Sequence, residues 1–455
     1  MSVPESIDKR AYNIKKLVCR PLPGGIPLLP DRPLMTTGTP NPTPISPEAT
    51  ISAATRHTIL LLSFATFSSM ASQRICDAML PELSRVFSAS LAQAAQVVSM
   101  FAVVYGLAQL FYGPLGDRFG KFRIVVFATL ACSIGSTVAA FSDTLPMLVL
   151  ARVMVAMAAA AVIPLSMAWI GDVVSGEHLQ ETLARIGLGT TLGIVGGQLA
   201  GGIFTDTLGW RWAFVFMTLL FGVVGSLLYG NWRRQLQATP AALSRAPLPR
   251  PNFLMQSMRI ITGSWSRIVL IVGFIEGAVG FGVLAIWASH LHRTLGLSLS
   301  ISGAIVALFG LGGMLYMAVA RPLIRRFGQQ CLTMSGVCLL GFPAFVFAFT
   351  PWWPLTLPAS LLGGFGFFMF HNTMQANATQ MAPAARGTAV SLFASALFLG
   401  QSAGVLLAAA LVDRIGSGAV IATGGAILML VGFLFAHALR KREQAAAANL
   451  RPAGP

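Results

Sequence analysis

The sequence predicts an all-α integral membrane protein with twelve transmembrane helices in two pseudo-symmetric six-helix halves. Hydrophobic residues make up 55% of its 455 positions, and charged residues make up only 10%. Typical soluble domains are roughly 25% charged, so this composition excludes an ordinary soluble protein. Apolar stretches long enough to cross a bilayer recur along the chain, and short polar motifs repeat at about half its length.

The repeats indicate that the chain is duplicated. The loop Gly113–Lys121 (Gly-Pro-Leu-Gly-Asp-Arg-Phe-Gly-Lys) returns 208 residues later, in a changed form, as Arg321–Gln329. A pattern of two glycines and an aspartate repeats after 207 residues, as Gly193, Gly197 and Asp206 and then Gly400, Gly404 and Asp413. Duplicated halves facing each other across a central cleft are typical of proteins that work by alternating access.

The apolar stretches give the expected spans. A helix needs roughly 20 apolar residues to cross the hydrocarbon, where no water can satisfy an open backbone. The twelve expected spans are 57–79, 92–112, 124–142, 146–169, 186–205, 212–230, 267–289, 300–320, 331–350, 356–380, 386–411 and 417–439.

The remaining segments complete the domain organisation. The first 55 residues contain 10 of the 26 prolines and no apolar run long enough for a signal peptide. A regulatory or lipid-contacting role for this basic leader, and a misplaced start codon, are both open. The expected organisation is a disordered basic proline-rich cytoplasmic leader (1–56), an N-terminal half (57–230), a cytoplasmic linker (231–266), a C-terminal half (267–440) and a cytoplasmic tail (441–455).

Basic residues predict the orientation. With the N-terminus inside, 25 of the 31 Lys and Arg residues fall in the leader, the even-numbered connections and the tail. The positive-inside rule therefore predicts a multi-pass protein of the plasma (bacterial inner) membrane with both termini cytoplasmic. This topology accounts for the net charge of +16 without a nucleic-acid partner.

The loop motif carries a family resemblance. Together with Arg152, the segment Asp77–Pro81 and the glycines between Gly193 and Gly202, it resembles the major facilitator superfamily over about residues 57–440. Within that superfamily it resembles the twelve-helix drug:proton antiporter (DHA1-like) branch. The resemblance implies that Gly113 and Gly120 permit tight turns and that Asp117 and Lys121 form charge contacts between helices. The implied latch, which includes Arg118, joins the halves on the cytoplasmic side in the outward-open state.

Three more motifs support this resemblance. Arg152 in the fourth span resembles the branch's buried arginine, and Asp77-Ala-Met-Leu-Pro81 resembles an acid-xxx-Pro pattern of its multidrug exporters. For Arg152, the alternative is packing against a helix end or snorkelling outward. The fifth span resembles the antiporter signature, with Gln198 in place of its usual proline, although close helix packing also explains the glycines. Its residues are Gly193, Gly197, Gln198, Gly201 and Gly202.

Glu276 is the leading candidate for proton coupling. It is the only acid between Asp206 and Asp413 and falls near the middle of the seventh span. Hydrocarbon disfavours an ionised carboxylate, so such an acid can gain and lose a proton in each cycle. The alternatives are a structural acid satisfied by a neighbouring helix and direct pairing with a cationic substrate. Asp77 is a second candidate, with Arg152 or Arg74 as partner or with simple solvation near the outer surface.

The tenth span suggests a substrate cavity. It presents His371, Asn372 and Gln375 after a run of phenylalanines, and His371 and Gln375 share a helix face. Gln109 and Gln401 are expected to face the same cleft. Polar groups among aromatic rings suit an amphipathic organic substrate, although a lone histidine in a span can also be a satisfied helix contact.

These features predict a secondary active exporter, with antiport direction supplied by the resemblance. A proton-coupled importer of a small metabolite is the alternative, and a polytopic membrane enzyme is a remote one, because the central loop has no acid or histidine. We expect no enzyme activity, no cofactor and no metal. The expected partners are a small-molecule substrate, protons and the lipid bilayer, and the protein is expected to be a monomer.

Overall fold

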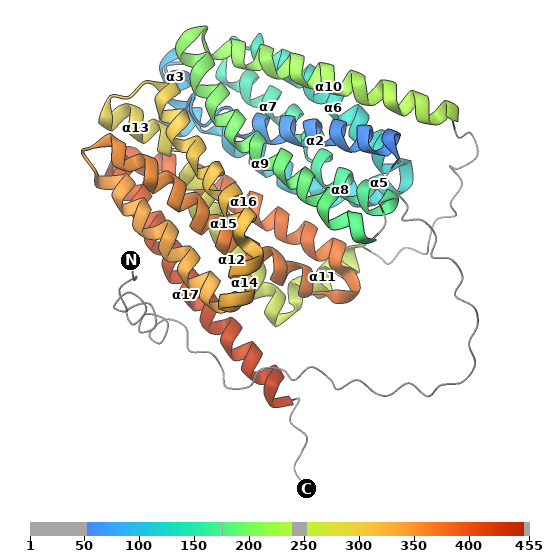
Figure 1. The fold of residues 1–455 in the computed structure, drawn as a ribbon. Coiled ribbons are helices and arrows are strands. Elements are labelled where there is room, and N and C mark those ends of the chain that lie inside the picture. Colours follow the sequence, from blue (N-terminus) through green and yellow to red (C-terminus); the bar gives the residue numbers. More distant parts are fainter. Residues whose placement is uncertain (1–51, 175, 239–252, 450–455) are drawn as a thin grey trace, which may run out of the picture. The chain divides into compact units, whose positions relative to one another are not determined.

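The computed structural model describes residues 52–174, 176–238 and 253–449 (Figure 1). Nearly all of the predicted leader, the middle of the predicted linker and the end of the predicted tail lie outside these residues. The chain divides after Arg56 into two units, and the second unit, His57–Pro455, holds the helical bundle.

The first half of the bundle contains six long helical segments in chain order. They are α2 (Ala53–Arg74), α5 (Gln96–Phe119), α6 (Lys121–Ala140), α7 (Leu145–Ala159) followed by α8 (Val162–Val173), α9 (Gly176–Thr207) and α10 (Trp210–Ala238). Two short helices, α3 (Leu80–Val86) and α4 (Leu91–Ala94), connect α2 to α5. Ser90 and Gln93 form a capping box at the start of α4, which satisfies backbone donors there.

The second half begins with the short helix α11 (Phe253–Thr262), which lies within the predicted linker. Its long segments are α12 (Ser264–Glu276) continued by the π-helix η1 (Gly277–Gly282), α14 (Leu299–Phe349), α15 (Thr356–Gln380), α16 (Arg386–Ile415) and α17 (Ser417–Asn449). Short connecting helices are α13 (Trp287–Leu295), η2 (Trp353–Leu355) and η3 (Pro383–Ala385). The predicted seventh span is thus interrupted by a π-helical turn.

The twelve-helix arrangement is confirmed once two particular segments are taken into account. Among the described residues, ten helical segments are long and apolar enough to cross a membrane. One of them, α14, has 51 residues, which at 1.5 Å per residue is more than twice a hydrocarbon core of about 30 Å. Its backbone is non-helical at Gly328 (φ 71°), so α14 contains two spans. Helix α2, at 22 residues, is the twelfth, and its serines and threonines lower its hydropathy.

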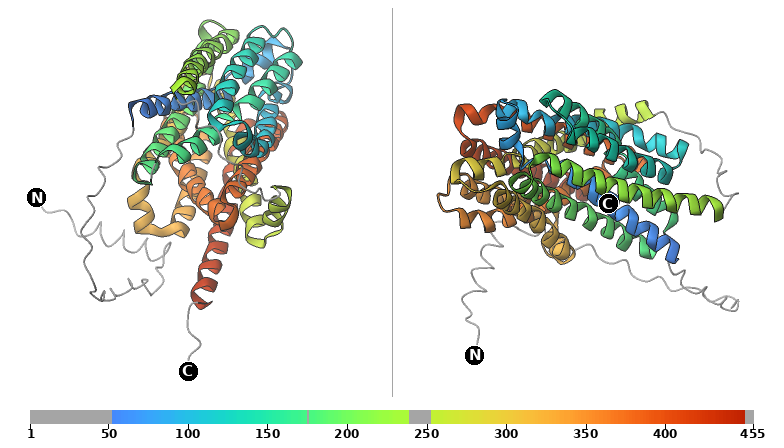
Figure 2. Two further views of the ribbon diagram at one scale, coloured as in Figure 1. Left: turned by 90° about the vertical axis from the view of Figure 1, so that its right-hand side faces the viewer. Right: turned by 90° about the horizontal axis from the view of Figure 1, so that it is seen from above.

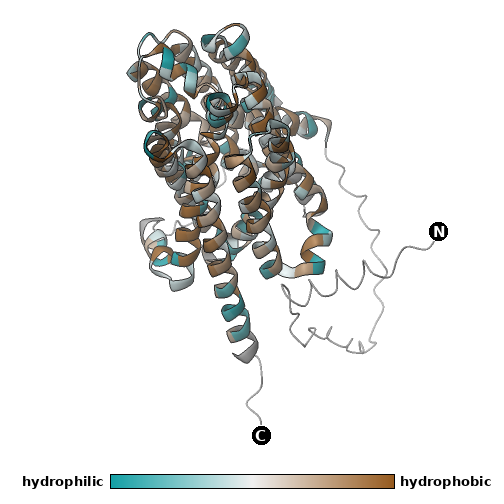
Figure 3. Ribbon diagram, turned by 90° about the vertical axis from the view of Figure 1, so that its left-hand side faces the viewer, coloured by the Kyte–Doolittle hydropathy of each residue, from teal (hydrophilic) through white to brown (hydrophobic). Residues whose placement is uncertain are grey.

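The surface of the bundle suits a lipid environment. Large apolar side chains such as Phe111 and Phe342 are 68% and 64% exposed, and an apolar surface of this kind faces lipid in membrane proteins. Figure 3 shows hydrophobic residues along the helices and a hydrophilic end of α17, where Arg440, Lys441 and Arg442 are exposed.

Glycines allow close helix contact in the first half. A Cβ atom at Gly193, Gly197 or Gly201 of α9 would collide with a backbone carbonyl oxygen in or just after α2, at Phe67, Ala71 or Ile75 respectively. The two sets advance in steps of four residues, so one face of α9 lies against α2. Three of the four predicted antiporter-like glycines therefore lie on the packing surface between α9 and α2.

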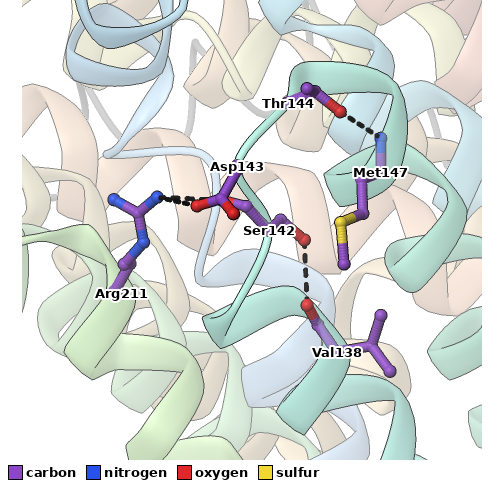
Figure 4. A network of polar contacts seen from close by, with 6 residues as sticks. All are labelled: Val138, Ser142, Asp143, Thr144, Met147 and Arg211. Atoms are coloured by element: carbon purple, nitrogen blue, oxygen red, sulfur yellow. Dashed lines mark hydrogen bonds and ion pairs between the residues drawn. The ribbon is translucent and has the colours of Figure 1, made fainter.

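Polar contacts fix the connection between α6 and α7 (Figure 4). Arg211 of α10 donates to the carbonyl oxygen of Ser142 at 3.0 Å and pairs with Oδ1 of Asp143 at 3.3 Å. Thr144 accepts a hydrogen bond from the backbone N–H of Met147 and caps α7. These contacts attach the start of α10 to the loop.

The two halves meet through helix pairs from opposite halves, α9 with α14 and α5 with α16 (Figure 2). We name the two ends of the bundle by residues: the Asp206 end contains Asp206 and Asp413, and the Lys121 end contains Gly113–Lys121 and its repeat, Arg321–Gln329. From mid-bundle to the Asp206 end, a Cβ atom at Gly310, Gly303 or Gly202 would collide with the opposite half. At the Lys121 end, most residues of both loops are exposed.

Candidate functional site

A buried acid and a histidine pair in the second half. Glu276 is the last residue of α12 and is 0% exposed, and its Oε1 lies 2.7 Å from Nδ1 of His371 on α15. Its Oε2 has no hydrogen-bond partner among the described residues. The ring of Phe367 stacks on His371 with centroids 5.7 Å apart. The structure thus joins two residues that the sequence singled out separately.

The π-helical turn η1 shapes this pair. A side chain at Gly277 would collide with the carbonyl oxygen of Leu397 on α16, so only glycine permits this contact. Phe281 lies five residues after Glu276, and a π-helix brings such positions closer than an α-helix does. Both residues face His371, since the rings of Phe281 and His371 are 6.3 Å apart in an edge-on arrangement.

A second buried acid lies in the first half. Asp77, 0% exposed, follows α2 in an irregular segment at residues 75–79. Its Oδ2 lies 3.3 Å from Nη1 of Arg74 and accepts a hydrogen bond from Nε2 of Gln198 at 2.9 Å. Of the alternatives left open by the sequence, Arg74 is therefore the partner, and solvation of Asp77 is wrong because the neighbouring helices cover it.

Arg152 donates hydrogen bonds to backbone carbonyl groups and not to the carboxylate of Asp77. It is 1% exposed, and its Nη1 donates to the carbonyl oxygen of Ser72 at 2.8 Å while its Nε donates to that of Val97 at 3.3 Å. Its guanidinium lies over the ring of Phe101, 4.2 Å from the centroid. Arg152 thereby connects α7 to α2 and α5, and Nη2 has no partner among the described residues.

Two contacts cross between the halves beside Asp77. Gln73 of α2 donates to Oε1 of Gln401 on α16 at 3.3 Å, and Gln401 is 0% exposed. The guanidinium of Arg74 lies over the ring of Phe281, 4.4 Å from its centroid. Gln401 was predicted to face the cleft between the halves, whereas Gln73 and Phe281 were not singled out by the sequence.

The other predicted cavity residues are dispersed. Asn372 donates to the hydroxyl of Tyr316 at 3.1 Å within the second half, Gln375 is exposed and Gln109 is half-buried. A small cavity lies inside the second half, lined in part by Val279, Trp287 and Phe309, and it includes none of the predicted cavity residues. The substrate cavity stays a prediction. No group of three His, Cys, Asp or Glu residues that could hold a metal ion is found in the part of the chain that the structure describes.

The predicted latch loop makes its contacts inside the first half. Gly120 has φ +90°, a conformation that favours glycine, and it separates α5 from α6. Nζ of Lys121 lies 2.6 Å from Oδ2 of Asp172 on α8 and 3.9 Å from Oδ1 of Asp117. The guanidinium of Arg118 lies over the ring of Phe119, and Gly113 has open space around it. Asp172 was not anticipated, because it is 51 residues from Lys121.

Known proteins resemble this chain in sequence. The sequence profile of the Major Facilitator Superfamily matches residues 62–405 and 269–454. The chain is 27% identical to the chloramphenicol resistance protein of Streptomyces lividans over 77% of its own length and 88% of the relative's. It is 24% identical to the multidrug resistance protein B homolog of Mycobacterium tuberculosis over 58% of each chain. It is also 23% identical to an uncharacterized MFS-type transporter, YceJ, of Bacillus subtilis, covering 83% of that protein.

Solved structures share the fold. A bacterial homolog of the human lysosomal transporter Spinster, in an inward-facing and unoccupied conformation, superposes with a TM-score of 0.66 at 16% identity, over 85% of this chain and 96% of that one. A mutant form of the nucleoside transporter NupG gives a TM-score of 0.67 at 14% identity, over 84% and 98% of the two chains. The profile match, the duplicated helices and these folds agree: the chain belongs to the Major Facilitator Superfamily and is a membrane transporter.

Proposed function

We propose that this transporter is a proton-coupled antiporter that exports small amphipathic organic compounds by alternating access. The observation that carries the proposal is the environment of Glu276, which is fully buried. One of its carboxylate oxygens is hydrogen-bonded to His371, and the other has no hydrogen-bond partner among the described residues. Burying an acid inside a membrane span is costly, so an acid that is found there points to a functional role.

The chemistry of the pair supports proton exchange. A buried carboxylate is stabilised by a nearby hydrogen-bond donor, and a proton on its free oxygen removes its charge. In the proposed cycle, a proton from the outside neutralises Glu276, substrate binding weakens and the substrate leaves. Loss of the proton to the inside restores the ionised acid, which is held by His371 until the next cycle. Asp77 is the proposed second proton site.

The packing of the halves supports alternating access. They are in close contact from mid-bundle to the Asp206 end, while the loops at the Lys121 end are exposed. If the Lys121 end is cytoplasmic, as the basic residues predict, this arrangement is inward-facing. The outward-facing arrangement then requires the contacts between α9 and α14 to open.

The surroundings of the pair and the relatives support the substrate class. Phe281, Phe367, Phe368 and Phe393 all have rings within 6.3 Å of His371, measured between centroids. Aromatic surfaces with few polar groups suit a partly apolar organic molecule. Two of the relatives carry chloramphenicol or multidrug resistance in their names, which supports export.

Glu276→Gln in proteoliposomes tests the proposal, with a compound first identified by an efflux screen in a strain without its own exporters. The amide keeps the size of the side chain but cannot carry a proton through an ionised state. We expect pH-driven transport to be lost and the folded protein to be retained. Glu443→Gln is the matched control, because Glu443 is exposed at the far end of α17. Undiminished pH-driven flux in Glu276→Gln would remove Glu276 as the proton carrier.

Direction and topology have separate tests. Cells that lack the gene should retain more of the exported compound, whereas an importer would make them retain less. Reporter fusions after α6 and α17 test the orientation: the end of α17 should report a cytoplasmic position, and the α6–α7 loop should report the outer side of the plasma membrane.

A further inference from the structure

Five side chains, the two buried acids included, form a continuous series. Asp77 pairs with Arg74 at 3.3 Å, and the guanidinium of Arg74 lies 4.4 Å from the ring centroid of Phe281. Phe281 in turn contacts the ring of His371, which bonds to Glu276 at 2.7 Å. The series crosses from the first half to the second between Arg74 and Phe281.

Arg74 is incompletely satisfied where it lies. It is 1% exposed, its Nη1 bonds to Asp77, and its Nε has no hydrogen-bond partner among the described residues. A buried arginine needs a compensating charge or an aromatic face, and here it has one of each, from different halves. Separation of the halves would remove the aromatic face and leave Arg74 with the carboxylate of Asp77.

Phe281 is held in place by packing within the second half. It is 8% exposed, and its ring packs against Phe367 with centroids 4.6 Å apart. The π-helical turn η1 sets its position relative to Glu276, and glycines at Gly277 and Gly282 place that turn directly against α16. A movement of η1 would therefore move Glu276 and Phe281 together.

We propose that Arg74 is a positioning residue that couples the two acids: the strength of its contact with Phe281, which joins the halves, depends on whether Asp77 and Glu276 are ionised. Protonation of Asp77 removes the counter-charge of Arg74, and protonation of Glu276 alters the hydrogen bond that positions His371 against Phe281. Either event changes the strength of the cation–π contact between the halves at this level. This inference rests on the proposed proton coupling and names the residues that link it to opening.

Other groups act on the same acids. Arg152 and Arg74 are the two charges that act on Asp77, Gln198 donates a hydrogen bond to it, and the thiol of Cys76 is adjacent. Glu276 faces His371 as its titratable neighbour. Arg152 stays within the first half, so Arg74 is the charged group that reaches across.

The test compares Phe281→Leu and Arg74→Lys with a control, Phe309→Leu. Phe309 belongs to the same aromatic cluster, 5.4 Å from Phe367, and its contacts in that cluster are with other rings. Purified variants in vesicles loaded with a pH-sensitive dye report proton entry without substrate, and the same vesicles report transport as a function of pH. We expect Phe281→Leu and Arg74→Lys to raise substrate-free proton entry about fivefold over the control and to flatten the pH profile.

Each outcome decides a different point. If the wild type couples substrate to protons and both variants match Phe309→Leu in both assays, the role of Arg74 is overturned while the proposed function stands. If the wild type moves no protons with its substrate, the proposed function fails and this inference with it. Should Phe281→Leu not fold, Arg74→Lys decides the question, because lysine keeps the charge but not the planar group that lies over the ring.

Discussion

Oδ2 of Asp206 in α9 accepts a hydrogen bond from the backbone N–H of Ser300 in α14 at 2.5 Å. The two residues belong to opposite halves, and Ser300 lies in the first turn of its helix. A carboxylate at this position satisfies a free backbone donor and interacts favourably with the positive end of the helix dipole. The contact therefore stabilises closure of the Asp206 end.

Asp206→Asn is expected to favour opening of this end. Loss of the charge should cost the closed arrangement about 1 kcal/mol, which is roughly a fivefold change in the ratio of the two states. Distances between spin labels at Leu208 and Thr294 measure that ratio. The matched control is Asp413→Asn, the pseudo-equivalent position, whose exposed pair with Arg293 at 4.0 Å joins two elements of the second half. An unchanged distance distribution in Asp206→Asn would contradict the assignment.

Substitutions at two adjacent glycines should distinguish closure of the Asp206 end from the stability of the fold. A side chain at Gly202 would collide with Leu299 in the opposite half, whereas one at Gly201 would collide with Ile75 in its own half. Overpacking costs about 1–3 kcal/mol. Gly202→Val should therefore open the Asp206 end with little loss of thermal stability, and Gly201→Val should lower the unfolding temperature. Thermal unfolding and the label distances distinguish the two effects, and equal loss of stability in both variants would refute the distinction.

Asp172 and Asp117 both lie near Lys121, but their substitutions are expected to have different effects. In this arrangement Lys121 bonds to Asp172 at 2.6 Å and is farther, at 3.9 Å, from Asp117. Both pairs are partly exposed, so Asp172→Asn should cost only about 0.2–1 kcal/mol of stability. We expect Asp117→Asn to lower the maximal transport rate more than the apparent affinity, because the family resemblance implies that Asp117 acts in the outward-open state. Transport kinetics test this, and a change confined to apparent affinity would argue against it.

The sequence was sufficient for the fold because its signals are local or periodic. Runs of apolar residues located the spans, and the repeat of the Gly113 loop predicted two halves. Helix ends were less accurate: the first span was expected to reach residue 79, but α2 ends at Arg74, where an irregular segment allows Asp77 to turn toward Gln198. Gly328 alone marks the boundary between two spans in α14.

The site was only partly predictable, since its contacts join residues far apart in the chain. Glu276 and His371 were both chosen by residue type, but their bond spans 95 residues. The pairing of Gln73 with Gln401 spans 328 residues, and no periodicity carries it. Phe281 was missed because an aromatic residue in a membrane span is ordinary. Its ring lies beneath the guanidinium of Arg74 because it belongs to a π-helical turn. The glycines around Phe281 are compatible with such a turn but do not predict it.

The central claim is that Glu276 carries the proton that is exchanged for substrate. It is tested most directly by measuring pH-driven transport and substrate-for-substrate exchange in the same Glu276→Gln vesicles, since exchange alone requires no net proton movement. We predict that exchange is kept and that pH-driven transport falls to the level of protein-free vesicles. Retention of both activities at the level of Glu443→Gln would contradict the account.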